Sequence, residues 1–365
     1  MASVGQRVLV VERRAHLGGN AYDEHNDRGL LVHRYGPHIF HTNSPVVWNY
    51  LSRFTEWRLY EHRVLGSIQG QLVPIPFNLN SLSALFPGEL ASRIERGLVA
   101  ECGFDKRIPI LKLRESTQPE LIELGEYVYR HVFEQYTIKQ WGYRPEELDP
   151  GVTARVPILV SRDNRYFQDT YQAMPSRGYA AMFSRMLDHP NINILLNCDW
   201  KELTQEFSCA QILYTGEIDE FMSYRFGPLP YRSLRFDQCT LDISQYQPVG
   251  TINFPNSNEF TRITEQKHLT GQRSECTTII TEYPMLHEPG RTIAYYPIPR
   301  QENRLLHSKY VQAARKEFPN VVFGGRLADY QYYNMDQACA RALKLASENN
   351  GPQWNGRTSE TDILK

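Results

Sequence analysis

Two arginines in this chain stand in polar, aromatic-rich segments of the kind that bind phosphate. Arg155 precedes the segment DNRYF (163–167), and Arg262 lies in FTRITEQKH (260–268). A guanidinium group can bind diphosphate oxygens through two parallel hydrogen bonds, so both arginines are candidate phosphate ligands. Because most arginines are only solvated surface residues, neither is strong evidence by itself.

Aromatic side chains in the segment YTIKQWG (136–142) offer a second kind of chemistry. Tyr136 and Trp141 could stack on a nucleotide base or a sugar through their flat ring faces. A helix end packed by aromatic residues accounts for the same composition equally well. Further along, FGGRLADYQYYNM (323–335) ends a strand in a glycine pair before a helix, a geometry that can cradle a diphosphate.

The beginning of the chain has part of a dinucleotide-binding pattern. RVLVVERR (7–14) is typical of a buried strand, and it contains Glu12, which could accept hydrogen bonds from ribose hydroxyls or be an ordinary surface carboxylate. Gly18 and Gly19 follow in a turn that lets the backbone approach a ligand, although most glycine pairs are simply turns. Only six residues precede the strand. We therefore expect the first Rossmann strand and its GxGxxG loop to be missing, which would weaken folding and cofactor binding.

Three histidines, His33, His38 and His41, occur in or next to RYGPHIFHTN (34–43). A metal site needs a complete ligand set, and no carboxylate or cysteine completes one with these histidines, so we expect no metal. Contact with a flat cofactor, or plain packing, accounts better for this crowded polar segment.

The elements that must position these residues alternate between strands and helices. Apolar runs typical of buried parallel strands occur at 7–14, 192–197, 211–216 and 321–326, with helical stretches around 181–187 and 335–347. Residues 81–101 and 117–140 have helical character, and the second stretch opens with a capping box of Thr117 and Glu120. Segments rich in β-branched and aromatic residues fill 249–299 and predict an antiparallel sheet.

This pattern predicts an α/β fold in which a Rossmann-like nucleotide-binding domain is interrupted by a helical bundle and an antiparallel sheet. The nucleotide-binding domain is expected to be discontinuous, with the ranges 1–77, 178–227 and 318–350. The helical domain would span 78–150, and the antiparallel sheet would take 151–177 and 228–317. Residues 351–365 have the composition of a polar tail.

Composition limits the partners of the protein. Its 365 residues suffice for two or three packed units. Forty Lys and Arg stand against 41 Asp and Glu, so there is no basic excess for binding a nucleic-acid backbone. Six Cys without a CxxC pair are typical of a chain whose cysteines stay reduced. The sequence has no apolar run long enough to predict a membrane span and no start that predicts a signal peptide. We therefore expect a cytoplasmic protein that binds no nucleic acid and has no membrane span.

Taken together, these segments resemble the UDP-galactopyranose mutase family from about Val8 to Ser347. The matching strings are long and specific: VLVVERRAHLGGNAY, YGPHIFHTN, PFNLN, YTIKQWG, DNRYF, YTGEIDEFMSYRFGPLPYRSL and FGGRLADYQYY. The resemblance implies an isomerase that interconverts UDP-galactopyranose and UDP-galactofuranose, supplying galactofuranose for surface glycans. It also implies an FAD cofactor that must be reduced and whose N5 forms an adduct with the sugar.

The resemblance further implies a role for each matching residue. Arg155 and Arg262 would be catalytic, because they would hold the UDP diphosphate and neutralise its charge as it leaves. The substrate-binding residues would be Tyr136 on uracil, Trp141 on a closing loop, and also Tyr166, Tyr296, Tyr332 and Asn334. The cofactor-binding residues would be Glu12, Arg13, Gly18, Gly19, Asn20, His38, His41, Gly325 and Arg326. Two positions depart from the family pattern: Asn334 stands where Asp is usual, and Leu159 where Arg is frequent.

The implied partners are UDP-galactose in both ring forms, NAD(P)H or another reductant for the flavin, and a second copy of the chain in a homodimer. Two alternatives stay open. One is a non-catalytic nucleotide-sugar-binding protein that cannot hold FAD, which a colourless protein with tight UDP binding would favour. The other is a related flavin oxidoreductase, which turnover of an oxidisable substrate would favour.

Overall fold

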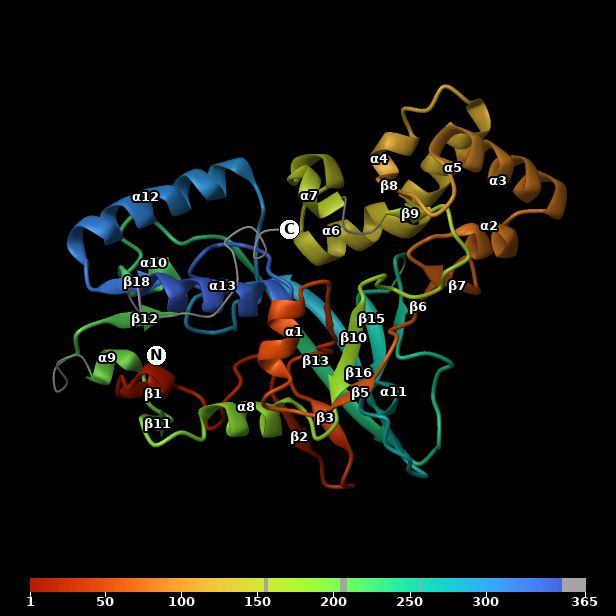
Figure 1. Ribbon diagram of the computed structural model, residues 1–365. Helices are drawn as coiled ribbons and strands as arrows, with labels where there is room; N and C mark the ends of the chain where they lie inside the picture. The colour runs from red at the N-terminus through yellow and green to blue at the C-terminus, as the bar shows by residue number, and fades with distance from the viewer. Residues whose placement is uncertain (154–156, 204–208, 257, 350–365) are drawn as a thin grey trace.

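A computed structural model describes residues 1–153, 157–203, 209–256 and 258–349 of the chain (Figure 1). Parallel strands with their helices form one side of the molecule, on the left in Figure 1, and a block of helices lies at the upper right. A large, mainly antiparallel sheet lies between and below them. The predicted α/β class, with a Rossmann-like part, a helical block and an antiparallel sheet, is confirmed.

The parallel strands form two separate pairs. β1 (Val8–Glu12) pairs with β11 (Ile192–Leu196), and β12 (Ile212–Tyr214) pairs with β18 (Val321–Phe323). Among the described residues, no further strand joins either pair. The helices on this side are α8 (Tyr179–Leu187), α9 (Trp200–Leu203), α10 (Ile218–Phe221), α12 (Gln301–Glu317) and α13 (Met335–Asn349).

The large sheet has seven strands in the order β17-β13-β16-β15-β14-β6-β7. Its strands are β6 (Val64–Ile68), β7 (Gln71–Ile75), β13 (Tyr231–Leu241), β14 (Thr251–Asn253), β15 (Arg262–Glu265), β16 (Thr277–Leu286) and β17 (Tyr296–Pro297). All neighbours are antiparallel except β14 and β6. The β-branched residues at the start of β16 are buried, as expected for a strand inside a sheet.

The helical block packs on the edge of this sheet. Its members are α2 (Leu79–Leu85), α3 (Gly88–Cys102), α4 (Ile110–Leu113), α5 (Pro119–Val128), the π-helix η2 (Tyr129–Glu134) and α6 (Gln135–Trp141). Leu82, Leu98 and Leu121 are buried in one apolar core with Ile68 and Val73 of the sheet. The block and the sheet edge therefore share a single core.

The remaining elements are short. They are η1 (Ala2–Val4), β2 (Asp23–His25), β3 (Leu31–His33), β4 (Phe40–Thr42), α1 (Pro45–Leu51), β5 (Trp57–Leu59), β8 (Arg107–Ile108), η3 (Pro145–Glu147), α7 (Pro150–Thr153), β9 (Ile158–Leu159), β10 (Tyr171–Pro175) and α11 (Gln266–Thr270). No helix in the described part of the chain is long and apolar enough to cross a membrane.

The structure differs from the sequence expectation in three places. β6 and β7 belong to the large sheet, although 1–77 is predicted to belong to the nucleotide-binding domain. β10 joins β4 and β5 in a separate three-stranded sheet rather than the large one. The expected capping box at Thr117 is wrong, because α5 begins at Pro119 and its N-cap, Gln118, makes no side-chain capping bond.

Candidate active site

The large sheet places an arginine and a glutamate directly opposite each other on neighbouring strands. Arg262 begins β15, and its Cα pairs with that of Glu282 on β16. Nε and Nη2 of Arg262 lie 2.9 and 2.8 Å from the same oxygen, Oε2 of Glu282. Burial alone would lower the pKa of Arg262, but Glu282 and the nearby phenols outweigh it and hold that pKa well above its usual value. Arg262 is therefore a permanent cation.

Three tyrosines and a tryptophan surround this cation. Tyr136 lies on α6, Tyr296 on β17, and Tyr332 in the loop between β18 and α13. The rings of Tyr296 and Tyr332 are 5.1 Å apart, and the ring of Trp141 lies 6.1 and 5.6 Å from them. Segments more than 150 residues apart in the sequence thus meet at one point.

Two phenols of this cluster, those of Tyr136 and Tyr296, are held in their protonated form. Burial raises the pKa of Tyr136, an effect that Arg262 partly opposes and Glu282 reinforces. Burial, together with Tyr332 and Glu282, also raises the pKa of Tyr296. A protonated phenol can donate a hydrogen bond to an anion, whereas a phenolate would repel it.

The end of α6 that carries Trp141 is fixed to the sheet by a buried arginine. Arg232 on β13 donates from Nε to the carbonyl of Gln140 and from Nη2 to that of Lys139, both at 2.9 Å. These carbonyls belong to the last turn of the helix, where no backbone N–H is available to them. Trp141 itself is 7 % exposed.

Two histidines, His38 and His62, lie near Arg262. The Nδ1 of His38 hydrogen-bonds the carbonyl oxygen of Gly36 at 2.9 Å, and burial, with Arg326 and Arg262 nearby, lowers the pKa of His38 to about 4. Burial, followed by Arg262, lowers the pKa of His62 to about 3. Both rings are therefore neutral near pH 7.

Tyr166 and His41 lie next to His62 rather than next to Trp141. The ring of Tyr166 meets that of His62 edge-on at 5.8 Å. His41 stacks on Phe167 at 3.6 Å, and its Nδ1 lies 3.0 Å from Oδ2 of Asp169. His41 is thus held by a carboxylate and a ring of its own protein.

The segment after β18 contributes a second arginine. The guanidinium of Arg326 lies 5.4 Å from the ring of Tyr296 and 5.6 Å from that of Tyr332, and it donates to the carbonyl of Tyr333 at 2.6 Å. Gly325, with φ +111°, precedes it, in a conformation that L side chains rarely adopt. Asn334 follows the tyrosines, and its backbone N–H donates to Oε1 of Gln337 at 2.9 Å.

At the end of β1, a bonded network joins Glu12, Arg14 and Asn20. Oε1 of Glu12 accepts from the backbone N–H of Arg14, and Oδ1 of Asn20 accepts from Nη2 of Arg14, each at 2.9 Å. Nη1 of Arg14 is buried and has no hydrogen-bond partner among the described residues. Gly18 is needed for packing, because a Cβ there would lie 2.8 Å from the ring of Phe183, whereas Gly19 has open space beside it.

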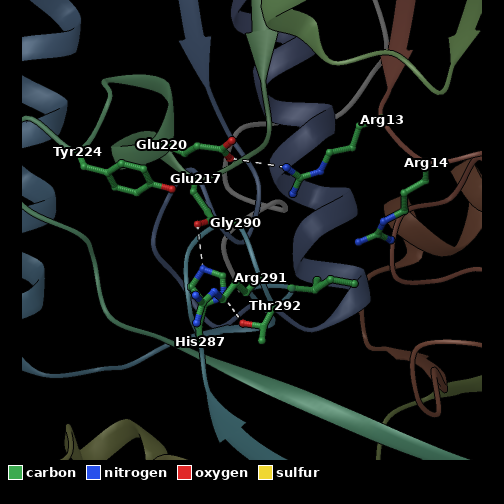
Figure 2. A pocket seen from close by; sticks show the side chains of 10 residues that line it. Arg13, Arg14, Glu217, Glu220, Tyr224, His287, Gly290, Arg291 and Thr292 are labelled. Carbon is green, nitrogen blue, oxygen red and sulfur yellow. Dashed lines mark hydrogen bonds and ion pairs between the residues drawn. The ribbon is translucent and has the colours of Figure 1, made fainter.

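A cavity of about 330 Å³ lies between the carboxyl ends of β1 and β12 (Figure 2). Arg13 and Arg14 line one side of it, Glu217, Glu220 and Tyr224 line the other, and His287, Arg291 and Thr292 lie below them. Arg13 forms an ion pair with Glu220 at 3.8 Å. In open α/β sheets, ligands bind outside the carboxyl ends of the strands. Arg13 and Arg14 are suited to bind a diphosphate, and Glu12, which precedes them at the end of β1 and does not line the cavity, is suited to bind a ribose, so the residues at this strand end fit a dinucleotide cofactor.

The structure thus brings together Tyr136, Trp141, Arg262, Tyr296, Tyr332, Arg326 and His38, with Tyr166 and His41 beside His62. Glu12, Arg13, Gly18, Gly19 and Asn20 gather at the other end, by the cavity or on the turn that follows it. Arg155 lies outside the described residues. In the described part of the chain, no group of three or more His, Cys, Asp or Glu is placed to hold a metal ion.

Sequence reasoning did not select Arg14, His62, Arg232 or Glu282. The sequence does mark Glu282 as unusual, because it is the one charged residue within the strand-like run TTIITEYP, and a charge inside a buried strand indicates a partner or a function. His62 and Arg232 had no such signal in the sequence, since their positions near the cluster depend on the tertiary fold.

Comparison with known proteins identifies the family of this chain. Residues 131–332 match the family model described as UDP-galactopyranose mutase, and residues 1–54 match that of an NAD(P)-binding Rossmann-like domain. A probable UDP-galactopyranose mutase from Klebsiella pneumoniae is 35 % identical over 351 residues, which cover 95 % of this chain and 90 % of the relative. A dTDP-fucopyranose mutase from Escherichia coli is 31 % identical over 353 residues, 95 % of this chain and 93 % of the relative.

The fold is also that of a UDP-galactopyranose mutase structure. A crystal structure of reduced UDP-galactopyranose mutase superposes with a TM-score of 0.66 at 13 % identity, covering 97 % of this chain and 90 % of that one. At that identity the superposition speaks for the fold alone, whereas the identity to the Klebsiella pneumoniae relative over nearly the whole chain decides the family. The chain belongs to the UDP-galactopyranose mutase family.

Proposed function

We propose that this protein is a flavin-dependent isomerase that interconverts UDP-galactopyranose and UDP-galactofuranose. The observation that carries the proposal is the meeting of Arg262 with Tyr136, Tyr296 and Tyr332 around one point of the large sheet. A fixed cation among protonated phenols matches the two negative charges of a nucleotide diphosphate. Membership of the mutase family gives that anion its identity as UDP-galactose.

The cofactor we propose is FAD in its reduced form. Glu12, Arg13 and Arg14 would hold its adenosine and diphosphate, and Gly325, Arg326 and His38 would lie toward its flavin. When bound, a reduced flavin supplies a nucleophilic nitrogen for the anomeric carbon of the sugar. A cellular reductant such as NAD(P)H would keep it reduced.

The protein's own residues bind the leaving group and shield it. Arg262 neutralises charge that grows on the diphosphate as its bond to the sugar breaks, together with Arg155. Tyr166, Tyr296 and Tyr332 donate hydrogen bonds to the same oxygens, and Tyr136 stacks on the base. Trp141, which packs against Tyr296 and Tyr332, covers the site and excludes water. The same family membership leads us to propose a cytoplasmic homodimer that serves galactofuranose-containing surface glycans.

The test is a visible absorption spectrum of the purified chain, followed by reduction with dithionite and chromatographic assay with UDP-galactofuranose. We expect a flavin spectrum and UDP-galactopyranose that forms only after reduction. A colourless protein that stays inactive with added FAD would contradict the proposal, and tight UDP binding by it would indicate a non-catalytic binding protein. Production of hydrogen peroxide from an oxidisable substrate would instead indicate a flavin oxidoreductase.

A second nucleotide sugar belongs in the same assay. The relative named dTDP-fucopyranose mutase is 31 % identical to this chain, close to the 33 to 35 % of the relatives named UDP-galactopyranose mutase. We expect a higher kcat/KM with UDP-galactofuranose than with dTDP-fucofuranose. The opposite ratio would assign the deoxysugar as substrate while leaving the reaction class unchanged.

A further inference from the structure

Glu282 is a buried carboxylate in the middle of the proposed diphosphate site. It is 1 % exposed, whereas the side chain of its partner Arg262 is 26 % exposed. Arg262 thus reaches the open side of the pair, and Glu282 lies behind it. Any anion that binds Arg262 from the open side approaches a cation that is already paired.

The pair differs from a saturated structural ion pair. Both Arg262 donors go to Oε2 of Glu282, and Oε1 is buried with no hydrogen-bond partner among the described residues. Buried carboxylate oxygens without a partner are uncommon in native proteins, and each calls for an explanation.

A second buried carboxylate on the next strand gives the comparison. Glu265 on β15 is also 1 % exposed, but both of its oxygens accept hydrogen bonds. The donors are the backbone N–H groups of Tyr246 and Gln247 and the hydroxyl of Thr277, at 2.6 to 3.1 Å. Glu265 has the saturated environment of a structural carboxylate, and Glu282 does not.

Near the Arg262–Glu282 pair lie protonated phenols and one further cation, Arg326, whose guanidinium is 5.4 Å from the ring of Tyr296. Burial raises the pKa values of Tyr136, Tyr295 and Tyr296, and the carboxylate of Glu282 raises them further. The rings of His38 and His62, whose lowered pKa values reflect burial and the charge of Arg262, are neutral. Glu282 is thus the charge that offsets Arg262 within this cluster, and its removal would leave the guanidinium unopposed.

We propose that Glu282 is a positioning residue that acts electrostatically, because it orients Arg262 and limits how tightly the site holds UDP. This inference rests on the proposed function. Each turnover makes the diphosphate a leaving group and then requires it to react again, so a site that binds free UDP too tightly loses turnover. A carboxylate behind the arginine keeps the guanidinium in place and weakens its net field.

The experiment compares UDP binding and turnover in Glu282→Gln and Glu282→Ala. Glutamine keeps the size and one acceptor for Arg262 but removes the charge, so we expect the Kd for UDP, measured by calorimetry, to fall about 10-fold. Turnover of UDP-galactofuranose should also fall, because UDP that is held too tightly after it leaves the sugar is slower to react with the sugar again. Alanine also removes the acceptor that orients Arg262, so its Kd should exceed that of the glutamine variant.

A matched control is available in the same sheet. Asp237 on β13 pairs with Arg235 at 2.5 Å, but both side chains are about half exposed and lie outside the tyrosine cluster. Asp237→Asn removes one carboxylate from an arginine pair of the same sheet. We expect it to leave the Kd for UDP unchanged.

A Kd for UDP that rises in Glu282→Gln, or stays at the wild-type value, overturns the inference. If wild-type protein binds no UDP, the proposed function fails first, so the two failures are distinguishable. Should Glu282→Gln not fold, Arg262→Gln and the double variant Arg262→Gln/Glu282→Gln make the same comparison with and without the carboxylate. UDP binding must then be tighter in the double variant, and equal binding contradicts the inference.

Discussion

The strand that carries Glu282 is hydrogen-bonded to neighbours on both sides, whereas β1 and β12 each have a strand partner on one side only among the described residues. β16 pairs with β13 over ten residues and with β15 over four. On the nucleotide side, Leu9, Ile194 and Leu213 are 40 to 47 % exposed although parallel strands are usually buried on both faces. We call the region around Arg262 and Glu282 the substrate end and the region around β1 and β12 the nucleotide end. The large sheet holds the substrate end by hydrogen bonds on both sides, and the nucleotide end is held less firmly.

This difference separates substrate binding from cofactor binding. Arg262 and Tyr296, which we propose to face the diphosphate, are positioned by strand pairing in the large sheet, whereas Tyr332 comes from the loop after β18. The residues that would hold the dinucleotide lie at strand ends with exposed apolar neighbours. A bound cofactor would stabilise that end by its binding free energy.

Arg262→Ala should break the substrate end alone. We expect kcat to fall by about 1000-fold, because the cation that neutralises the developing charge is lost. Flavin absorbance per protein should stay at the wild-type value, since Arg262 lies in the sheet away from the cavity near β1. Parallel loss of flavin would show that the two ends are not separable.

Ile280→Ala tests how much the large sheet depends on its core. Ile280 on β16 is 1 % exposed, so its truncation should cost about 3 kcal/mol in the free energy of unfolding. Urea denaturation followed by circular dichroism measures this loss. A cost under about 1 kcal/mol would mean that the sheet is not the firmer region.

Acid should weaken the substrate end through His62. Its pKa is about 3 in the folded protein and about 6.5 in an unfolded chain, so both states are neutral above pH 6.5. Below that pH the unfolded chain takes up a proton first, and the free energy of unfolding should drop by about 2 kcal/mol by pH 5. His62→Gln should flatten this part of the pH profile, and an unchanged slope would place the titration elsewhere.

Leu213→Ala gives the smallest effect and completes the comparison. Leu213 on β12 is 47 % exposed, so its truncation should cost about 0.5 kcal/mol. The same urea experiment applies, and hydrogen exchange should find the amides of β12 less protected than those of β16. A cost equal to that of Ile280→Ala would erase the difference between the two regions.

The architecture was predictable from the sequence because apolar runs and helical periodicity mark strands and helices directly. Tyr136 and Tyr332 could be selected because they lie in distinctive strings, whereas Tyr296 was implied only by the family resemblance. The pairing of Arg262 with Glu282 was not, because it depends on the register between two strands. The capping box at Thr117 failed because a proline two residues later begins the helix instead.

Hydrogen bonds from two cations join α6 to the large sheet and its loops, and this limits how the helical block can move. On one side, Arg232 binds the carbonyls of Lys139 and Gln140, and on another, Nζ of Lys139 donates to the carbonyls of Phe254, Asn258 and Phe260. These two cations make α6 part of the sheet's rigid body, although in the sequence it continues the helical block. The π-helical turn of Tyr129–Glu134 just before α6 does not loosen this attachment, because Tyr129, Val132 and Phe133 are buried in the core that the helical block shares with the sheet edge. We therefore expect the helical block and the large sheet to move as one body.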